Sequence, residues 1–170
     1  PGYEVDIAGQ MNRFKDETGK GVLVKDLEDF AAVLDSLILC KFIRKCFTDY
    51  YTEAAYLYSQ ATGLDMTPAE LKAAGERINN VKKAFNIREG WKCSDDWLPP
   101  RLFSDPITEG EGKGTVISKE GLSLMINDYY KARGWTSEGM IPDDKLRSLE
   151  LDDSIEPLKG LQYGTQVYRL

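Results

Sequence analysis

The sequence contains no histidine, and this absence excludes several kinds of self-contained catalysis. Histidine is the commonest general acid or base and the commonest metal ligand in proteins. This stretch of chain therefore cannot build a Ser-His-Asp triad, a Cys-His pair or a histidine-ligated zinc site by itself. The patterns G-x-x-x-x-G-K-[ST] and G-x-G-x-x-G are also missing, and the glycines of 110–115 follow a polar loop rather than a strand. We therefore expect no phosphate-binding loop.

Long apolar runs and an excess of positive charge are missing as well. No stretch approaches the roughly 18 apolar residues of a membrane span, and the start PGYEVDIAGQ lacks the pattern of a signal peptide. The chain carries 22 Lys and Arg against 28 Asp and Glu, a net charge of -6. An acidic chain is poorly suited to bind phosphate backbones. We expect neither a membrane nor a nucleic-acid partner.

Cysteines are few and poorly spaced for a disulfide framework or a complete metal site. Cys40, Cys46 and Cys93 are odd in number and contain no C-x-x-C pair. Cys46 follows Cys40 by six residues, unlike the usual cluster spacing, and Cys93 lies in a different loop, so we expect neither Cys46 nor Cys93 to bind iron. This usage favours a reducing, cytoplasmic setting. Cys40 lies in the otherwise apolar run DSLILCKF, five residues after Asp35. If this run is buried, the thiol is an ordinary core group, but the aspartate needs a partner for its charge.

Hydrophobic periodicity predicts an all-α, multihelical fold. In 67–90, Thr67 is a candidate N-cap, Pro68 fits the first turn, Glu70 completes a capping box and Gly90 can end the helix. The inward-facing stripes that helical spacing predicts are Leu71, Ala74, Ile78, Val81 and Phe85 in this helix; Leu122, Met125, Ile126, Tyr129 and Tyr130 in 118–133, ended by Gly134; Ala54, Leu57, Tyr58 and Ala61 in 51–63; and Leu27, Phe30, Ala31 and Leu34 in 25–34.

One long stretch, 92–114, is predicted to be irregular, because Pro-Pro, Asp-Pro and several glycines forbid a continuous helix. We expect it to lie on the surface, over the helices, held by Trp91 and Trp97. At most a short β pair is expected, near 114–117. The predicted organisation is a lead-in segment (1–24), a helical half (25–91), the long surface loop (92–114), a second helical half (115–151) and a tail (152–170).

Four stretches share their spacing with a known family. Residues 83–90 read KAFNIREG, 95–101 read DDWLPPR, 129–135 read YYKARGW and 145–151 read KLRSLEL. They resemble the patterns R-x-F-N-x-R-E-G, D-D-x-L-P-x-R, Y-Y-x-x-R-G-W and K-L-x-x-L-x-L in the C-terminal third of the tungsten-containing aldehyde ferredoxin oxidoreductases. Lys83 replaces the leading arginine. The likeness runs in unbroken order from about residue 35 to residue 151.

The resemblance implies roles for three residues of DSLILCKF. The family carries D-x-x-G-L-C-x, in which the aspartate accepts N–H bonds from a pterin ring and the cysteine is the last of four ligands to a [4Fe-4S] cluster. By this likeness Asp35 is the pterin acceptor, Leu39 lies against the cofactor and Cys40 is the metal ligand. A carboxylate suits N–H donors, and iron–sulfur clusters require thiolates. Ile38 stands at the motif's glycine, where its side chain would crowd the pterin.

The stripe of 25–34, if continued, would leave Asp35 off the inward face. We therefore expect a break or turn between residues 35 and 39 that lets Asp35 and Cys40 point into a common cleft.

The resemblance also implies that the chain is a C-terminal fragment of a larger enzyme, in keeping with a start that is not Met. The complete enzyme would oxidise an aldehyde to a carboxylic acid at a tungsten bis-pterin (molybdopterin) cofactor and pass electrons through a [4Fe-4S] cluster to ferredoxin. The family's C-x-x-C-x-x-x-C group, covering N-terminal domain and catalytic histidine are not in this sequence. The expected partners are the N-terminal remainder of the enzyme, ferredoxin and a small aldehyde, and a homodimer is compatible. In the isolated fragment the cleft of Asp35 and Cys40 is expected to be open to water, because the covering domain and the other cluster ligands are absent. The isolated fragment is also expected to hold no cofactor and to be inactive.

Two other functions stay open at this point. The tungsten subunit of an aromatic acyl-CoA reductase would look alike in this region but run its chemistry reductively, and a cofactor-free helical interaction domain would keep the fold alone.

Taken singly, Cys40 is more often a core thiol and Asp35 more often a helix cap. Lys41, Arg44 and Lys45 are more often a solvated face than a device that tunes a cluster.

Overall fold

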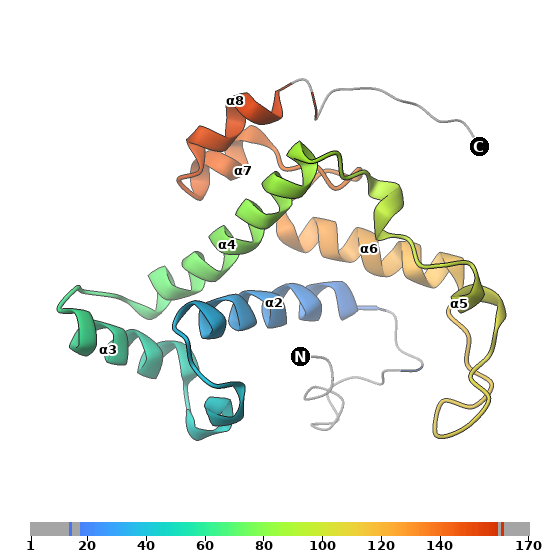
Figure 1. Ribbon diagram of the computed structural model, residues 1–170, viewed down its shortest axis with the longest axis horizontal. Coiled ribbons are helices and arrows are strands. Elements are labelled where there is room, and N and C mark those ends of the chain that lie inside the picture. Colours follow the sequence, from blue (N-terminus) through green and yellow to red (C-terminus); the bar gives the residue numbers. More distant parts are fainter. Residues whose placement is uncertain (1–13, 15–17, 160, 162–170) are drawn as a thin grey trace.

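The computed structural model describes residue 14, residues 18–159 and residue 161, and within them it contains helices and no strand. The predicted all-α fold is confirmed. Helix α2 (Lys20–Ser36) packs against both α4 (Pro68–Arg88) and α6 (Lys119–Arg133), and α3 (Tyr50–Thr62) packs against α4 (Figure 1). The shorter elements are the 3-10 helices η1 (Lys41–Cys46), η2 (Cys93–Asp96) and η3 (Asp152–Ser154) and the helices α5 (Arg101–Ser104), α7 (Asp143–Ser148) and α8 (Ile155–Leu158). None of the described helices is long and apolar enough to cross a membrane.

The two long helices α4 and α6 begin and end where the sequence predicts. The Thr67 hydroxyl accepts the Glu70 N–H at 3.2 Å, and the Glu70 carboxylate accepts the Thr67 N–H at 2.8 Å, which completes the capping box. Ser118 caps α6 through its side chain. Gly90 and Gly134 follow the helix ends with φ of +95° and +70°. These signals are local, because each one satisfies backbone groups that a helix end leaves without partners.

Two glycines let α2 approach its neighbours at backbone distance. A Cβ atom at Gly21 would lie 2.3 Å from the backbone nitrogen of Tyr129 in α6, and one at Gly75 in α4 would lie 2.6 Å from the carbonyl oxygen of Asp29. A larger residue at either position would push two helices apart, because the obstructing atoms belong to backbone. Helix α2 is thus held closely between α4 and α6.

The apolar core is divided between the two ends of α4. At the N-terminal end of this helix, Val33, Ala54, Ala55 and Leu71 join α2, α3 and α4. At the C-terminal end, Ala84, Ile87, Ile141, Leu146, Ile155 and Leu158 join α4 to α7 and α8. Ile155 and Leu158, which lie within the stretch 152–170 described above as a tail, are therefore part of the core.

The inward face predicted for α4 is only partly right. Leu71 is buried, but Val81 and Phe85 are 45% and 53% exposed, while Asn80 and Lys83 are buried in their place. The predicted stripe contains only apolar residues, whereas the helix turns two polar side chains inward because each finds a specific partner, as described below.

The face predicted for α3 is also shifted, whereas those of α2 and α6 are confirmed, since Leu27, Phe30, Ala31 and Leu34 are all buried or partly buried. In α3 the buried pair is Ala54 and Ala55, and Leu57 is half exposed. In α2 Leu34 is buried as predicted, together with Asp29. The predicted residues of α6 are all buried or partly buried: Leu122, Met125, Ile126, Tyr129 and Tyr130.

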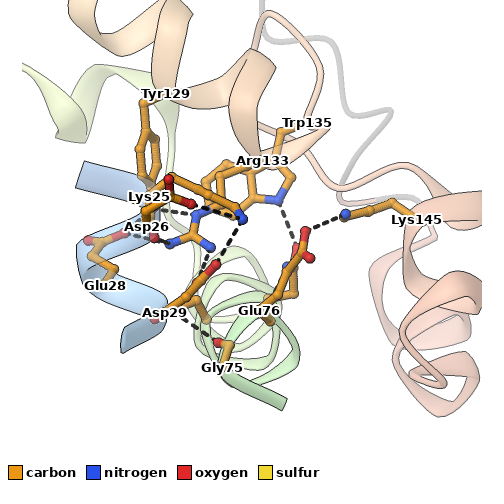
Figure 2. Close-up of polar contacts among 12 residues, drawn as sticks. Lys25, Asp26, Glu28, Asp29, Gly75, Glu76, Tyr129, Arg133, Trp135 and Lys145 are labelled. Atoms are coloured by element: carbon orange, nitrogen blue, oxygen red, sulfur yellow. Dashed lines mark hydrogen bonds and ion pairs between the residues drawn. The ribbon is translucent and has the colours of Figure 1, made fainter. Parts of the chain in front are cut away.

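A buried ion pair joins α2 to α6 (Figure 2). The Arg133 guanidinium, 0% exposed, donates from Nη1 to Oδ1 of Asp29 at 2.5 Å, and the Asp29 side chain is 1% exposed. Arg133 also donates to Glu28 at 2.8 Å and to the Tyr129 hydroxyl at 3.1 Å. Lys25 Nζ lies 3.0 Å from Asp29 Oδ2, an ion pair without the alignment of a hydrogen bond. Both Asp29 oxygens thus face a cation, which offsets the cost of burying the charge.

The polar network continues into α4. Asn79 donates to Oδ1 of the same aspartate at 2.7 Å, and Asn80 accepts the indole N–H of Trp135 at 2.8 Å. Glu76 accepts from Lys145 Nζ at 2.5 Å (Figure 2). Three long helices and the segment after α6 are therefore tied together by side chains that the apolar pattern does not reveal.

Lys83 is buried with its ammonium group against aromatic rings. The Nζ atom lies 2.8 Å from the centre of the Trp91 ring and 4.8 Å from that of Trp135, and the residue is 6% exposed. Burial lowers the pKa of Lys83 to about 8, although the nearby Asp96 carboxylate acts in the opposite direction. The ring faces favour the cation, which makes a lysine tolerable in this position.

The long segment 92–114 is anchored at its start. Asp96 accepts hydrogen bonds from the Trp91 indole at 3.1 Å and from the Tyr130 hydroxyl at 2.5 Å, which confirms Trp91 as an anchor. Trp97, the second predicted anchor, is 44% exposed and packs on Phe103 of the same segment, with ring centres 6.1 Å apart. Trp97 therefore makes a contact within the segment 92–114, instead of fixing this segment to the long helices.

We expect Arg133→Met to lower the free energy of unfolding by about 3–5 kcal/mol, because the buried Asp29 would lose its main cationic partner. Denaturant titration followed by circular dichroism measures this loss. The control is Arg88→Met, since the 3.0 Å ion pair of Arg88 with Glu89 is half exposed on both sides. This variant should lose less than about 1 kcal/mol. Equal losses in the two variants would contradict the assignment.

The lowered pKa of Lys83 predicts a dependence of stability on pH. Between about pH 8 and pH 9, the unfolded chain, in which Lys83 has a pKa near 10.5, binds more protons than the folded chain. The free energy of unfolding therefore rises with pH in this window, by about 1 kcal/mol from this residue. Closer to pH 10 the tyrosines whose pKa is raised in the fold act in the opposite direction. Lys83→Met should remove the rise, whereas the exposed neighbour variant Lys82→Met should keep it. Parallel pH profiles for wild type and Lys83→Met would show that Lys83 titrates normally.

Candidate functional site

Helix α2 ends inside the stretch DSLILCKF, at Ser36. The Leu39 N–H bonds to the carbonyl of Leu34, and the Ile38 N–H bonds to that of Asp35, both at 3.1 Å. This pair of bonds is the Schellman motif, in which the residue after the C-cap takes a left-handed conformation. Ile38 has this conformation, with φ of +57°. The break predicted between residues 35 and 39 is therefore present.

Ile38 occupies a position that glycine fits better. Left-handed backbone is rare for residues with a Cβ atom and rarest for β-branched ones, whereas glycine adopts it without strain. The side chain of Ile38 is 91% exposed. The glycine in the family's D-x-x-G-L-C-x pattern thus has a backbone explanation, the turn that ends the helix.

The turn brings the three predicted site residues to the C-terminal end of α2. Asp35 is exposed in the last turn of the helix, Leu39 is partly buried and Cys40 is an exposed free thiol that precedes η1. Asp35 Oδ1 lies 3.6 Å from Lys41 Nζ, and both side chains face solvent. Of the apolar residues that follow Leu34 in this run, Leu37 and Leu39 are partly buried, and Leu37 packs against the apolar cluster of α2, α3 and α4. Because Asp35 is exposed and paired with Lys41, its charge needs no buried partner.

Tyr50 is a residue near this end of α2 that the sequence analysis missed. Its ring packs against Phe30 and Phe47, with centres 4.5 Å and 5.3 Å apart. Burial, and next to it the charges of Tyr51 and Asp35, raise the pKa of Tyr50 to about 12. Its hydroxyl is buried and has no hydrogen-bond partner within the described residues. An aromatic residue at a helix start is usually core, so the sequence holds no signal for this hydroxyl.

The side chains of Asp35 and Cys40 fit one part of a larger cofactor site, the rest of which would come from elsewhere. Among the residues whose positions are described, no three His, Cys, Asp or Glu side chains lie together as a metal site would require. Cys46 ends η1 and Cys93 begins η2, and both are exposed free thiols. A [4Fe-4S] cluster takes four ligands, so a cluster on Cys40 needs further ligands from elsewhere. An exposed thiol and an exposed carboxylate suit a surface that another part of an enzyme completes.

We expect Ile38→Gly to raise the free energy of unfolding by up to about 1 kcal/mol. The substitution relieves a left-handed strain of roughly 1–2 kcal/mol, and the greater freedom of glycine in the unfolded chain offsets part of the gain. Denaturant titration measures the change. Ile38→Val, which keeps the Cβ branch, should leave stability nearly unchanged. A loss of stability in Ile38→Gly would mean that the exposed side chain makes a contact that the turn needs.

A family model and the sequences of known proteins agree with the sequence resemblance. A family model described as "Aldehyde ferredoxin oxidoreductase, domains 2 & 3" matches residues 2–151. The tungsten-containing aldehyde ferredoxin oxidoreductase of Pyrococcus horikoshii is 36% identical over 140 residues, which are 81% of this chain and 22% of that protein. The protein of the same description in Pyrococcus furiosus is 40% identical over 124 residues, 72% of this chain and 20% of that protein. The chain thus spans about a fifth of the length of these relatives.

A solved structure shares the fold. The active site complex BamBC of benzoyl coenzyme A reductase, in complex with 1,5-dienoyl-CoA, superposes with a TM-score of 0.71 over 91% of this chain and 23% of that chain. Sequence identity is 20%, so the likeness concerns the arrangement of helices.

Proposed function

Because this chain belongs to the aldehyde ferredoxin oxidoreductase family, we propose that it forms the C-terminal part of a tungsten-dependent enzyme that oxidises aldehydes to carboxylic acids. In the complete enzyme a tungsten bis-pterin would supply the centre for this two-electron oxidation of an aldehyde with water, and a [4Fe-4S] cluster held in part by Cys40 would pass the electrons to ferredoxin. The N-terminal remainder of the same enzyme supplies the other cluster ligands. Three free, exposed thiols suit the reducing cytoplasm that we propose for this protein.

The observation that carries the proposal is the turn at Ile38. It ends α2 so that Asp35 and Cys40 both leave the apolar core and face solvent. The Asp35 carboxylate can accept two N–H bonds from a pterin ring with its oxygens. The Cys40 thiolate can ligate iron, and Leu39 between them offers an apolar contact. In a purely structural helix end, neither a carboxylate nor a thiol would be needed here.

A second candidate is the tungsten subunit of an aromatic acyl-CoA reductase. The benzoyl coenzyme A reductase complex covers nearly the whole chain, which supports this candidate at the level of fold. The relatives at 36% and 40% identity favour aldehyde oxidation. Assays of the complete enzyme with aldehydes and with an aromatic acyl-CoA separate the two, because each candidate turns over one of these substrates.

In the complete enzyme, we expect Cys40→Ser to lower the iron content while largely sparing tungsten, since serine removes one thiolate ligand. Asp35→Ala should weaken pterin retention by ~1.5–3 kcal/mol, as charge-assisted hydrogen bonds are lost. Elemental analysis for iron and tungsten, with the fluorescence of released pterin, measures both effects.

Cys46→Ser and Cys93→Ser are the matched controls, because both cysteines are exposed and free like Cys40. They should retain wild-type iron. If Cys40→Ser and Asp35→Ala keep full metal content and full aldehyde oxidation, DSLILCKF is only a helix end. The cofactor-free interaction domain would then be the better description.

A further inference from the structure

The segment that follows Cys40 is basic, although the chain is acidic. Helix η1 contains Lys41, Arg44 and Lys45 and no acidic residue. These residues carry a charge of +3 in a chain of net charge -6, so the rest of the chain carries -9. Lys41 and Lys45 are exposed and Arg44 is partly exposed. The positive charge of η1 therefore stands out against the rest of the molecule.

Apolar side chains stand among these cations. Phe42 is 89% exposed and Ile43 is 38% exposed, and Ile38 on the preceding turn is 91% exposed. Aromatic residues and arginine are enriched in the centres of protein–protein interfaces. The exposed Phe42 among these cations thus makes η1 more like a protein contact surface than like a face that meets only water.

The side chains of η1 are also partly oriented. Lys41 forms an ion pair with Asp35 at 3.6 Å, and Arg44 donates from Nη1 to the carbonyl oxygen of Lys41. Lys45 has no ion pair among those described and is the cation best placed to meet a partner. All of these residues directly follow Cys40, the proposed cluster ligand.

We infer that η1 is the docking surface for the electron acceptor of the enzyme, a small acidic iron–sulfur protein. This inference rests on the proposed function, because it places the acceptor beside the cluster that Cys40 ligates. Each encounter moves one electron from the reduced cluster to the oxidised acceptor, so one aldehyde requires two encounters. Charges of opposite sign speed such encounters and make them sensitive to salt. Phe42 supplies the apolar contact that holds the two proteins during transfer.

The test uses the complete enzyme and two acceptors in parallel. An acidic [4Fe-4S] ferredoxin must dock, whereas benzyl viologen is a small molecule that needs no protein surface. For Lys45→Glu and for Arg44→Glu/Lys45→Glu, we expect the KM for ferredoxin at low ionic strength to rise about tenfold or more. The salt dependence of kcat/KM should flatten at the same time. Aldehyde oxidation with benzyl viologen should stay at the wild-type rate.

Two further variants sharpen the result. Lys119→Glu is the charge control, because α6 begins at this exposed residue beside α5, away from η1 in Figure 1. It should leave the KM for ferredoxin unchanged. Phe42→Ala should raise this KM at every salt concentration without altering the salt dependence, since the lost contact is apolar.

The outcomes separate the inference from the function on which it rests. An unchanged KM for ferredoxin in both charge variants overturns the docking surface, while viologen activity still supports the enzyme. Loss of both activities together with iron or tungsten means that the cations serve the cofactor and also overturns it. If the wild-type enzyme oxidises no aldehyde with viologen, the proposed function fails and the docking surface falls with it.

Discussion

The buried pair of Asp29 and Arg133 is the interaction on which the arrangement of the helices depends. The pair joins α2 to α6. Asn79 of α4 donates a hydrogen bond to the same aspartate, which links α4 to the pair. An ionised side chain inside a protein is costly unless its partners are in place, so the three helices have little freedom to slide. Because α2 ends at the turn that carries Asp35 and Cys40, a contact within the helix core sets the position of the site.

The sequence predicts those features of the fold that are encoded locally. The capping box at Thr67 and the glycine after α6 mark helix ends, because they act on backbone groups a few residues away. The inward faces are harder to predict. Asn80 and Lys83 point inward because Trp135 and Trp91 meet them. Trp135 is distant in sequence, and Trp91 lies beyond the end of the helix, where the chain has changed direction. Apolar periodicity has no means of recognising such pairs.

The candidate site follows from a motif rather than from periodicity. Asp35 and Cys40 are found through the family pattern, and the break between them follows from the end of the apolar stripe. An apolar run alone normally indicates burial, whereas the absence of the covering domain predicts that Asp35 and Cys40 are open to water, and both are exposed. The left-handed turn at Ile38 explains why the apolar run is not buried, because it directs the following apolar residues away from this chain's own core. That the Tyr50 hydroxyl is buried without a hydrogen-bond partner among the described residues follows only from the structure.

The division of the apolar core has a consequence for the motions of the molecule. Helix α4 contributes residues to both apolar clusters, one at each of its ends. We treat the two clusters as two cooperative units connected by this helix. The buried residues of the unit near the site are mostly small, and its larger members Tyr50, Tyr51 and Met66 are only partly buried, whereas the other unit buries isoleucines and leucines around the helix end. Local opening costs least where the least apolar surface is buried. We therefore expect the end of α4 near Cys40 to open more readily than the end that α7 and α8 hold.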